Sequence, residues 1–484
     1  MGDANKQIIV GEETVPPLSG FSGFISKFTV IFGARRELWL TFAIKFLIYT
    51  AYSITNKTMV LWLSKDLGFS DQAAGALVGW VWAPAMTVFT LLAGSLTDAI
   101  GLRRTFFLGV AICTFARTVM VTTTNPTLAL IAGMLPLAVG EALGTPVLLA
   151  ATRVYSTTAQ RSMAFSIIYA LMNVGYFVAG YVFDLIRNLD LHLSIGGFQP
   201  TPHEQLFGVS LALEILLFPT IYFLRRRQER ERQTHPTIFA TVRASAAETA
   251  ELFRKLVNQS GFYRLLVLFL FIGFLKAIFL QMDYVFPKFG DREMGLHAPV
   301  GKLAGINAIL IIVLAPLVGA LTQRIASYRM VIIGSIICTI GVFIMALPAD
   351  WFVPVANSMF GSALGHGYLR LTGAVHPYYV MSAFYLTVFS VGEAFYSPRV
   401  YEYAAAIAPP GQEASYGALA YIPFLVGKLL IGTSGWVLAA FCPEQGECRP
   451  AMLWLIFACA ASVAPLGLLV FRRYIQVQEA GRTN

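Results

Sequence analysis

The sequence predicts an all-α, polytopic membrane protein with twelve transmembrane helices, arranged as two parallel six-helix repeats. Three observations lead to this fold class. The 484-residue chain is 57% hydrophobic and only 13% charged, which is about half the charge of a soluble domain. Apolar runs of about 20 residues, each long enough to cross a bilayer, recur from end to end. A motif around residue 140 also returns around residue 392, which indicates an internal duplication.

The apolar runs define the predicted spans and, between them, the domains. The spans cover residues 38–63, 72–93, 105–124, 127–149, 163–186, 206–224, 262–286, 300–322, 329–348, 378–400, 414–440 and 451–471. The domains are an N-terminal tail (1–34), a six-helix bundle (35–224), a linker (225–261), a second six-helix bundle (262–471) and a C-terminal tail (472–484). The Gly-rich stretch Pro348–Pro377 is expected to be the largest outside loop.

The distribution of basic residues predicts the orientation. Arginines cluster in the linker and at the ends of apolar runs, as at Arg35, Arg36, Arg472 and Arg473. The positive-inside rule then places the linker and both termini in the cytoplasm. A net charge of +9 distributed in this way argues against nucleic-acid binding. We expect a monomer in the lipid bilayer of the plasma membrane or of a bacterial inner membrane.

The chain shows no pattern typical of an enzyme. No Ser-His-Asp arrangement, nucleotide-binding loop or metal-ligand cluster appears in the sequence, so we expect neither catalysis nor a metal or other cofactor. Cys442 and Cys448 could form a small disulfide if their loop faces an oxidising space. The other cysteines lie in apolar runs and are expected to be packing residues.

The internal repeat is visible in two alignments. At a shift of 252 residues, the segment Val139–Ala142 (VGEA) falls on Val391–Ala394 (VGEA). At a shift of 225 residues, GSLTDAIGLRRT from Gly94 falls on GALTQRIASYRM from Gly319. Together the alignments pair spans 2, 4 and 5 with spans 8, 10 and 11. The two halves are therefore expected to be related by an axis normal to the membrane.

One of these segments resembles the signature loop between spans two and three of the major facilitator superfamily. It reads GSLTDAIGLRR, and its characteristic positions are Gly94, Asp98, Gly101, Arg103 and Arg104. Glycines permit the tight turn and close approach that such a loop needs. The resemblance implies the major facilitator fold, and it implies that this loop is a conformational latch rather than a substrate site.

Three further segments resemble the proton-coupled oligopeptide transporter branch of that superfamily. They are AFSIIYALMNVG from Ala164, VFPKFGDREMGLHAPVG from Val285, and the Gly-Glu-x-x-x-Ser-Pro pattern that contains Glu393. The resemblance implies that Glu393 lies in the central cavity. Two charged motifs of the branch are altered, because Leu40 and Thr41 replace a Glu-Arg pair in span one and Thr145 replaces a lysine in span four. We therefore expect a divergent member.

The resemblance implies that spans 1, 4, 7 and 10 line a cavity, and each of them contains an ionisable residue. A charge inside a membrane is costly, so each should face the bundle interior and find a partner. The candidate residues for substrate binding or proton coupling are Lys45, Tyr49, Tyr52, Glu141, Lys276, Asp283 and Glu393, together with Arg117 in span three and Lys428 in span eleven. For several of them a structural role is the alternative. Glu141 could pair with Arg117, Asp283 could pair with a loop cation, Arg117 and Lys428 could form structural pairs or gates, and the tyrosines could be packing residues.

Four cations stand against three carboxylates among these candidates, which favours an anionic or zwitterionic solute such as a carboxylate, an amino acid or a peptide-like molecule. Because burial disfavours the charged form of a carboxylate, Glu393 or Glu141 could take up a proton and release a lysine for the substrate. The sequence thus predicts a proton symporter that works by alternating access and is driven by the proton gradient. An organic-ion exporter or facilitator is the alternative, and a receptor or scaffold without transport is a more remote one.

Overall fold

The computed structural model describes residues 30–189, 198–224, 260–322, 325–406 and 422–476, with single positions between 243 and 258. Most of the two predicted tails and of the linker 225–261 lie outside the described residues. The same holds for the side chains of Asp98 and Thr145.

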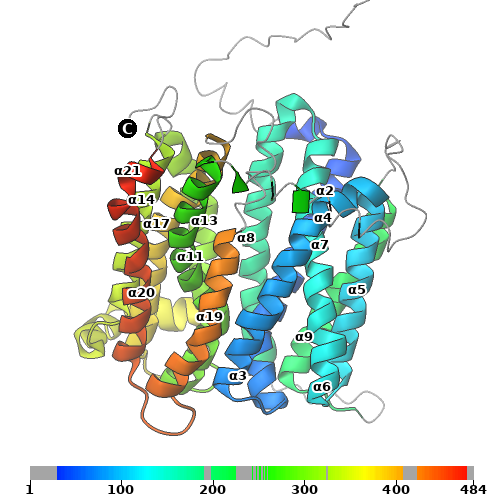
Figure 1. Cartoon of the computed structure of the whole chain (residues 1–484). Coiled ribbons are helices and arrows are strands. Elements are labelled where there is room, and N and C mark those ends of the chain that lie inside the picture. Colours follow the sequence, from blue (N-terminus) through cyan, green and yellow to red (C-terminus); the bar gives the residue numbers. More distant parts are fainter. Residues whose placement is uncertain are drawn as a thin grey trace, which may run out of the picture.

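The N-terminal half consists of six long helical stretches, several of which contain a π-helical turn. After a short 3-10 turn η1 (Val30–Gly33) they are α2 (Arg36–Leu61) with η2 (Trp62–Asp66); α3 (Asp71–Ala76), η3 (Leu77–Trp82) and α4 (Ala83–Ile100); α5 (Leu102–Thr122); α6 (Pro126–Leu128), η4 (Ala129–Met134) and α7 (Leu135–Tyr155); α8 (Thr158–Asn188); and α9 (Pro202–Tyr222). These elements run from blue to green in Figure 1.

The C-terminal half repeats this plan. Its long helices are α11 (Ser260–Tyr284), α13 (Val300–Leu321), α14 (Ser327–Ile344), α17 (Pro377–Ala406), α19 (Ile422–Phe441) and α20 (Pro450–Val470). Short elements connect or end them: α12 (Phe286–Phe289), η5 (Gly290–Met294), η6 (Ala349–Phe352), α15 (Val353–Ala356), α16 (Met359–Ser362), η7 (Ala363–Leu369) and α21 (Arg472–Ile475). The stretch expected as a Gly-rich loop thus contains four short helical elements.

The predicted all-α membrane fold is confirmed. Each predicted span coincides with one of the twelve helical stretches to within several residues where the chain is described. Within the described residues, 11 helices are long and apolar enough to cross a membrane. The remaining stretch is α17, whose 30 residues include several tyrosines and serines as well as Glu393 and Arg399. Polar side chains therefore concentrate in the tenth span, which makes it a candidate wall of a site.

Short local signals begin and connect the helices. Thr157 and Gln160 form a capping box at the start of α8, and Thr201 and Glu204 form another at the start of α9. Such boxes satisfy backbone N–H groups that have no partner within the helix. Gly101 joins α4 to α5 with a φ of 89°, a conformation that favours glycine. The tight turn expected at this glycine is present.

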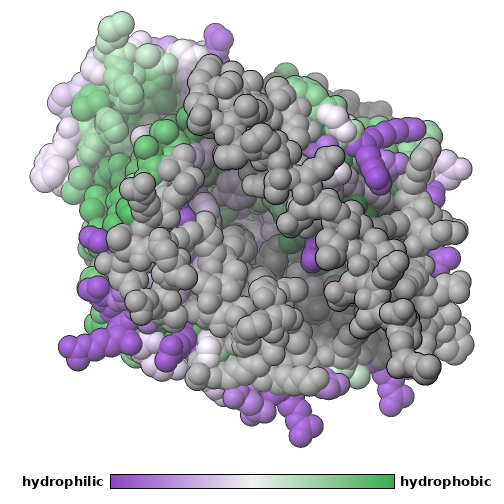
Figure 2. Space-filling view, turned by 90° about the horizontal axis from the view of Figure 1, so that it is seen from above, coloured by the Kyte–Doolittle hydropathy of each residue, from purple (hydrophilic) through white to green (hydrophobic). Residues whose placement is uncertain are grey.

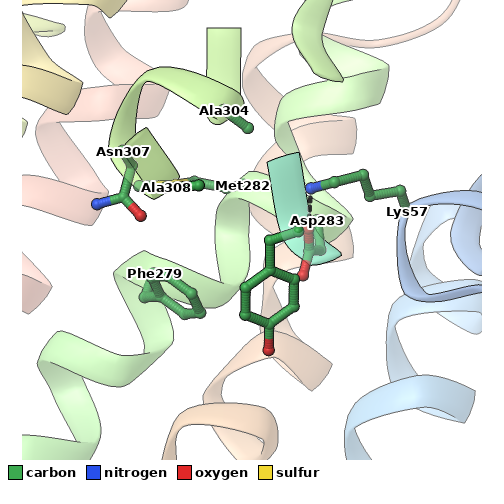
Figure 3. A pocket seen from close by; sticks show the side chains of 8 residues that line it. Lys57, Phe279, Met282, Asp283, Ala304, Asn307 and Ala308 are labelled. Carbon is green, nitrogen blue, oxygen red and sulfur yellow. Dashed lines mark hydrogen bonds and ion pairs between the residues drawn. The ribbon is translucent and has the colours of Figure 1, made fainter. Parts of the chain in front are cut away.

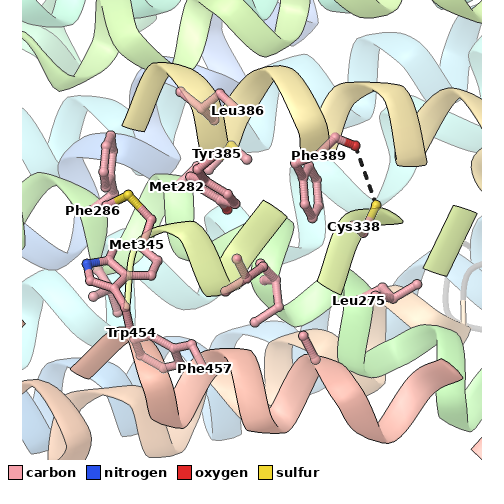
Figure 4. Packing of buried hydrophobic residues seen from close by; sticks show 14 of the residues in the cluster. Leu275, Met282, Phe286, Cys338, Met345, Tyr385, Leu386, Phe389, Trp454 and Phe457 are labelled. Carbon is pink, nitrogen blue, oxygen red and sulfur yellow. Dashed lines mark hydrogen bonds between the residues drawn. The ribbon is translucent and has the colours of Figure 1, made fainter. Parts of the chain in front are cut away.

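The internal repeat is visible in the packing of glycines. A Cβ atom at Gly140 would lie 2.5 Å from Cys113 Sγ, and one at Gly392 would lie 2.6 Å from Cys338 Sγ. The two glycines differ by the same 252 residues, and the two cysteines by the same 225 residues, as the aligned sequence segments. In each half the bare backbone of a glycine thus lets two helices approach closely. Figure 4 shows Cys338 in the C-terminal half, where its thiol donates to Phe389 O at 3.4 Å.

The two halves lie side by side (Figure 1) and meet most closely at one end. There α13 packs against α8, and α19 packs against α3. This end, which we call the closed end, contains the turns after α2 and α11. The opposite end carries the start of α2 and helix α21, and Figure 2, which looks onto it, shows hydrophilic side chains around its rim. The basic residues Arg35, Arg36, Arg472 and Arg473 belong to that opposite end.

Candidate functional site

A small cavity lies between the two halves. Lys57 and Tyr176 of the N-terminal half line it, and the C-terminal half contributes most of the wall: Phe279, Met282, Asp283, Ala304, Asn307 and Ala308. Figure 3 shows Lys57 and Asp283 joined by an ion pair on one side, with Asn307 on the other side. The wall of the cavity therefore carries charged, amide and aromatic groups.

Glu393 and Lys276 form a buried pair next to this cavity. Glu393 Oε1 lies 3.7 Å from Lys276 Nζ, and the side chains are 6% and 8% exposed. Asn307 Nδ2 donates to Glu393 Oε2 at 3.1 Å and to Ser390 Oγ at 2.9 Å, which connects the pair to the cavity wall. Lys276 Nζ also lies 3.4 Å from Ser397 Oγ. Ser390, Glu393 and Ser397 share one face of α17, because they are three and seven residues apart.

Aromatic rings surround the Lys276 ammonium group. Its Nζ lies 5.5 Å from the ring centroid of Phe279, 5.1 Å from that of Tyr396 and 5.0 Å from that of Phe424. Cation–π attraction of this kind is strengthened where water is absent. The three rings therefore stabilise the positive charge of Lys276 independently of the ionisation state of Glu393.

Two other predicted cations, Lys45 and Lys428, are buried without a carboxylate within 4.0 Å in the described part of the chain. Their residues are 4% and 5% exposed. Lys45 Nζ lies 3.5 Å from the ring centroid of Tyr49. Lys428 Nζ lies 4.2 Å from the ring centroid of Trp82 and 3.4 Å from Tyr52 Oη. Tyr49 and Tyr52 therefore contact cations directly rather than only filling space.

A row of aromatic side chains connects these cations to the cavity. Tyr49 lies 6.0 Å from Tyr52 and 6.0 Å from Tyr176, measured between ring centroids. Tyr176 in turn lies 6.4 Å from Phe279 of the other half. Lys45, Lys428 and Lys276 are thus arranged around a single aromatic surface that spans both halves.

Arg117 brings two carboxylates together inside the N-terminal half. Its guanidinium lies 2.9 Å from Glu141 Oε1 and 3.0 Å from Glu214 Oε2, and its side chain is 1% exposed. The ion pair considered for Glu141 and Arg117 is therefore present, and Glu214 of α9 is an additional partner. We call these three residues the arginine triad.

Asp283 pairs with Lys57 of α2 rather than with a loop cation. Lys57 is a span residue of the opposite half, so this pair joins the two halves. Tyr284 Oη also donates to Asn56 Oδ1 at 2.5 Å across the same boundary. Lys276 and Asp283 thus have separate partners, although they lie two turns apart on one helix.

Further ion pairs join the halves at the closed end. Asp291 lies 2.5 Å from Arg187 and 3.1 Å from Lys65. Asp71 contacts Lys288 at 2.5 Å and Arg292 at 2.8 Å. Each aspartate therefore bridges two cations, and in each case the charges come from both halves. Cys442 and Cys448 form a disulfide beside this cluster, and Arg292 donates to Cys442 O at 2.7 Å.

The predicted latch is described only in part. The Arg103 guanidinium lies over Phe107 and Tyr222, 5.6 Å and 5.1 Å from their ring centroids, and Arg104 is exposed. Because the Asp98 side chain is outside the described residues, its pairing stays a prediction, as does the role of Gly94.

Sequence reasoning missed several residues of the site. Lys57 and Glu214 lie within predicted spans, so the rule that selected Glu141 would also have selected them. Because Lys57 and Glu214 carry opposite charges, adding them to the candidate residues leaves the excess of one cation over carboxylates unchanged. Asn307 and Tyr176 gave no such signal, because a neutral polar side chain in an apolar run is common. Their roles follow only from the packing.

The family model of the major facilitator superfamily matches residues 41–369 of the chain. A search of curated proteins found no match to the sequence of this chain. A solved peptide transporter POT in complex with sulfate is similar, with 17% identity, a TM-score of 0.70 and coverage of 95% of this chain and 96% of that one.

Two other solved structures show the same likeness. A bacterial homologue of the human drug peptide transporters PepT1 and PepT2 has 18% sequence identity to this chain and a TM-score of 0.65. The alignment covers 91% of this chain and 98% of the homologue. A mutant of the nucleoside transporter NupG has 15% identity and a TM-score of 0.63, with coverage of 90% of this chain and 99% of its own. At such identities the likeness establishes a shared fold.

Proposed function

The chain belongs to the major facilitator superfamily and is a membrane transporter, and from this premise we propose that it moves a small anionic or zwitterionic organic solute together with protons. The observation that carries the proposal is the buried pair of Glu393 and Lys276 beside the cavity. The simplest function of such a pair is to couple the binding of a proton to the binding of the solute in a symporter that works by alternating access.

Protonation of Glu393 would change what Lys276 can bind. The neutral acid no longer attracts the ammonium group, while the three surrounding rings still stabilise the charge. Lys276 then becomes available to a carboxylate in the cavity. Deprotonation on the other side of the membrane restores the pair and expels the substrate anion, because the carboxylate of Glu393 competes for the same cation.

The charge of the surroundings favours an anionic group on the substrate. Lys45 and Lys428 have no carboxylate within 4.0 Å in the described residues and lie on the same aromatic surface. Removing an ammonium group from water is costly unless it acquires a partner. A carboxylate that entered between the halves would supply that partner, and the rings would pack against its apolar part.

The closed end supports alternating access. Ion pairs around Asp71 and Asp291 join the halves there, and the basic residues Arg35, Arg36, Arg472 and Arg473 belong to the opposite end. With that basic end in the cytoplasm, the described conformation is closed toward the outside. Opening it requires these charges to separate and become hydrated.

The test begins with a ligand. A thermal-shift screen of carboxylates, amino acids, dipeptides and vitamins identifies a compound that stabilises the purified protein. Its uptake into proteoliposomes is then measured with and without an imposed pH gradient. We expect accumulation only when the outside is more acidic. Glu393→Gln should still fold but should lose the response to the gradient.

Glu444→Gln is the matched control, because Glu444 is an exposed loop carboxylate. This variant should behave like the parent protein. If the rate and extent of uptake are the same with and without the pH gradient, and the same in Glu393→Gln as in the parent, proton symport is refuted and a facilitator is favoured. If proton entry instead drives the compound out of preloaded liposomes toward a higher outside concentration, the result would favour an exporter.

A further inference from the structure

The arginine triad is not used by the cycle proposed above, and its charges do not balance. Arg117 carries one positive charge, whereas Glu141 and Glu214 carry two negative charges when both are ionised. The three side chains are 1%, 6% and 6% exposed. An uncompensated charge at such a place is unfavourable unless a proton or another cation joins it.

One oxygen of the triad is left without a partner. Glu141 Oε1 accepts from Arg117 at 2.9 Å, but Oε2 is buried and receives no hydrogen bond from the described residues. The guanidinium Nε donates to Thr55 Oγ1 at 3.3 Å. Thr55 in turn bonds Ser210 at 3.4 Å. Oε2 of Glu141 is therefore the atom of the triad that is free to bind a proton.

The groups around Glu141 come from several neighbouring helices and include one cation of the other half. In addition to Arg117 and Glu214, the titratable groups that interact with it electrostatically are Cys113 on α5, Tyr52 on α2, Tyr284 on α11 and Lys428 on α19. Lys428 has no carboxylate within 4.0 Å in the described part of the chain. Its charge thus compensates the triad from across the boundary between the halves.

We propose that Glu141 Oε2 is a second proton-binding site, separate from Glu393, and that Lys428 is a mobile counter-charge that competes with this proton. The inference rests on the alternating access of the proposed function. When the halves move apart near α19, Lys428 leaves Glu141, and a hydronium ion transfers a proton to Oε2: one O–H bond of hydronium breaks, an O–H bond forms at Oε2, and a water molecule remains. When the halves close again, Lys428 returns, the O–H bond at Oε2 breaks, and the proton passes to a water molecule, which becomes hydronium.

The site is tested without any transport assay, by infrared spectroscopy of the purified protein titrated in sodium-free buffer. A buried neutral carboxylic acid gives a C=O stretching band distinct from that of a carboxylate. We expect one such band to be lost in Glu141→Gln and to persist in Glu393→Gln. Glu214→Gln removes the excess negative charge of the triad, so the band should also be lost there, because Glu141 then stays ionised beside Arg117.

Lys428→Gln tests the counter-charge. Without this cation the band should persist to a pH higher by about one unit or more, as expected when an opposite charge is removed from the vicinity of a carboxylate. Arg473→Gln, an exposed charge at the opposite end, should leave the titration unchanged.

Three results would overturn the proposal. A band unaffected by both Glu141→Gln and Glu214→Gln would show that the triad does not bind a proton. A titration identical in Lys428→Gln and the parent would exclude the counter-charge. A band lost on addition of Na⁺ at constant pH would assign the site to a metal cation. Failure of gradient-driven uptake, by contrast, would refute the proposed function and leave the band intact.

Discussion

The Arg187–Asp291 ion pair should determine how often the closed end opens. Asp291→Asn removes the negative charge but keeps Oδ1, which accepts from His297 N at 3.1 Å. Oδ1 also accepts from Arg187, whose side chain is 2% exposed, so the substitution leaves the buried guanidinium with a neutral amide oxygen in place of the carboxylate. The cost exists only in the closed conformation, because in an open one both groups would be hydrated.

The structure sets the size of the effect. Removing one partner of a buried pair costs about 3–5 kcal/mol. The lower value is appropriate here, because the Phe183 ring centroid lies 4.9 Å from Arg187 Cζ and Asp184 also interacts with this arginine. About 3 kcal/mol corresponds to a roughly 100-fold shift from closed to open.

Lys65 provides the matched control, because it contacts the same aspartate but its side chain is 35% exposed. Exposed pairs contribute about 0–1 kcal/mol, so Lys65→Gln should shift the equilibrium by about fivefold at most.

The assay is electron–electron double resonance between spin labels at Asn125 and Leu296, two exposed positions at the closed end in opposite halves. Cys459, the exposed free cysteine, is replaced by serine in the labelled protein. We expect the long-distance population to grow strongly with Asp291→Asn and little with Lys65→Gln. Equal shifts for the two variants, or an unchanged distribution for Asp291→Asn, would refute the argument that burial gives this pair its strength.

Three further predictions follow from other contacts. Burial by itself would raise the pKa of Asp291, but the nearby cations Arg187 and Lys65 hold this pKa below its ordinary value. The ionised carboxylate therefore stabilises the closed conformation fully above about pH 4, and this stabilisation is lost as the pH falls through the lowered pKa. The ratio of the open population in Asp291→Asn to that in the parent should thus be the same at pH 8 and pH 5. A ratio that changes between these pH values would contradict the lowered pKa of Asp291. Gly392→Ala should lower stability by about 1–3 kcal/mol in thermal unfolding, whereas Gly208→Ala, where a Cβ meets nothing within 4 Å, should be neutral or stabilising; equal effects would show that close packing at Gly392 is unimportant. Lys45→Gln should raise the Kd for an anionic ligand from the screen about 10- to 100-fold in calorimetry, and an unchanged Kd would remove Lys45 from the site.

The sequence by itself determined the elements of this protein, because each depends on local properties. Hydropathy over about 20 residues predicts a span whatever surrounds it. The glycine in the turn at Gly101 and the repeated glycines Gly140 and Gly392 were likewise visible, since a missing side chain is a local property with a consistent structural use. The stretch Pro348–Pro377 was less accessible, because its short helical elements gain their stability from packing against the bundle rather than from propensity.

Only the tertiary structure decided which charges are partners. Sequence reasoning marked Glu393, Glu141 and Asp283 as costly in a membrane, and it offered Arg117 as one possible partner of Glu141. It could not pair Glu393 with Lys276 or Asp283 with Lys57, and it did not find Glu214 as the second partner of Arg117. Each successive helical residue is rotated by about 100°, so small differences in helix rotation and register change which side chains meet. These quantities depend on how all twelve helices pack, and they alone distinguish a paired charge from one that awaits a substrate or a proton.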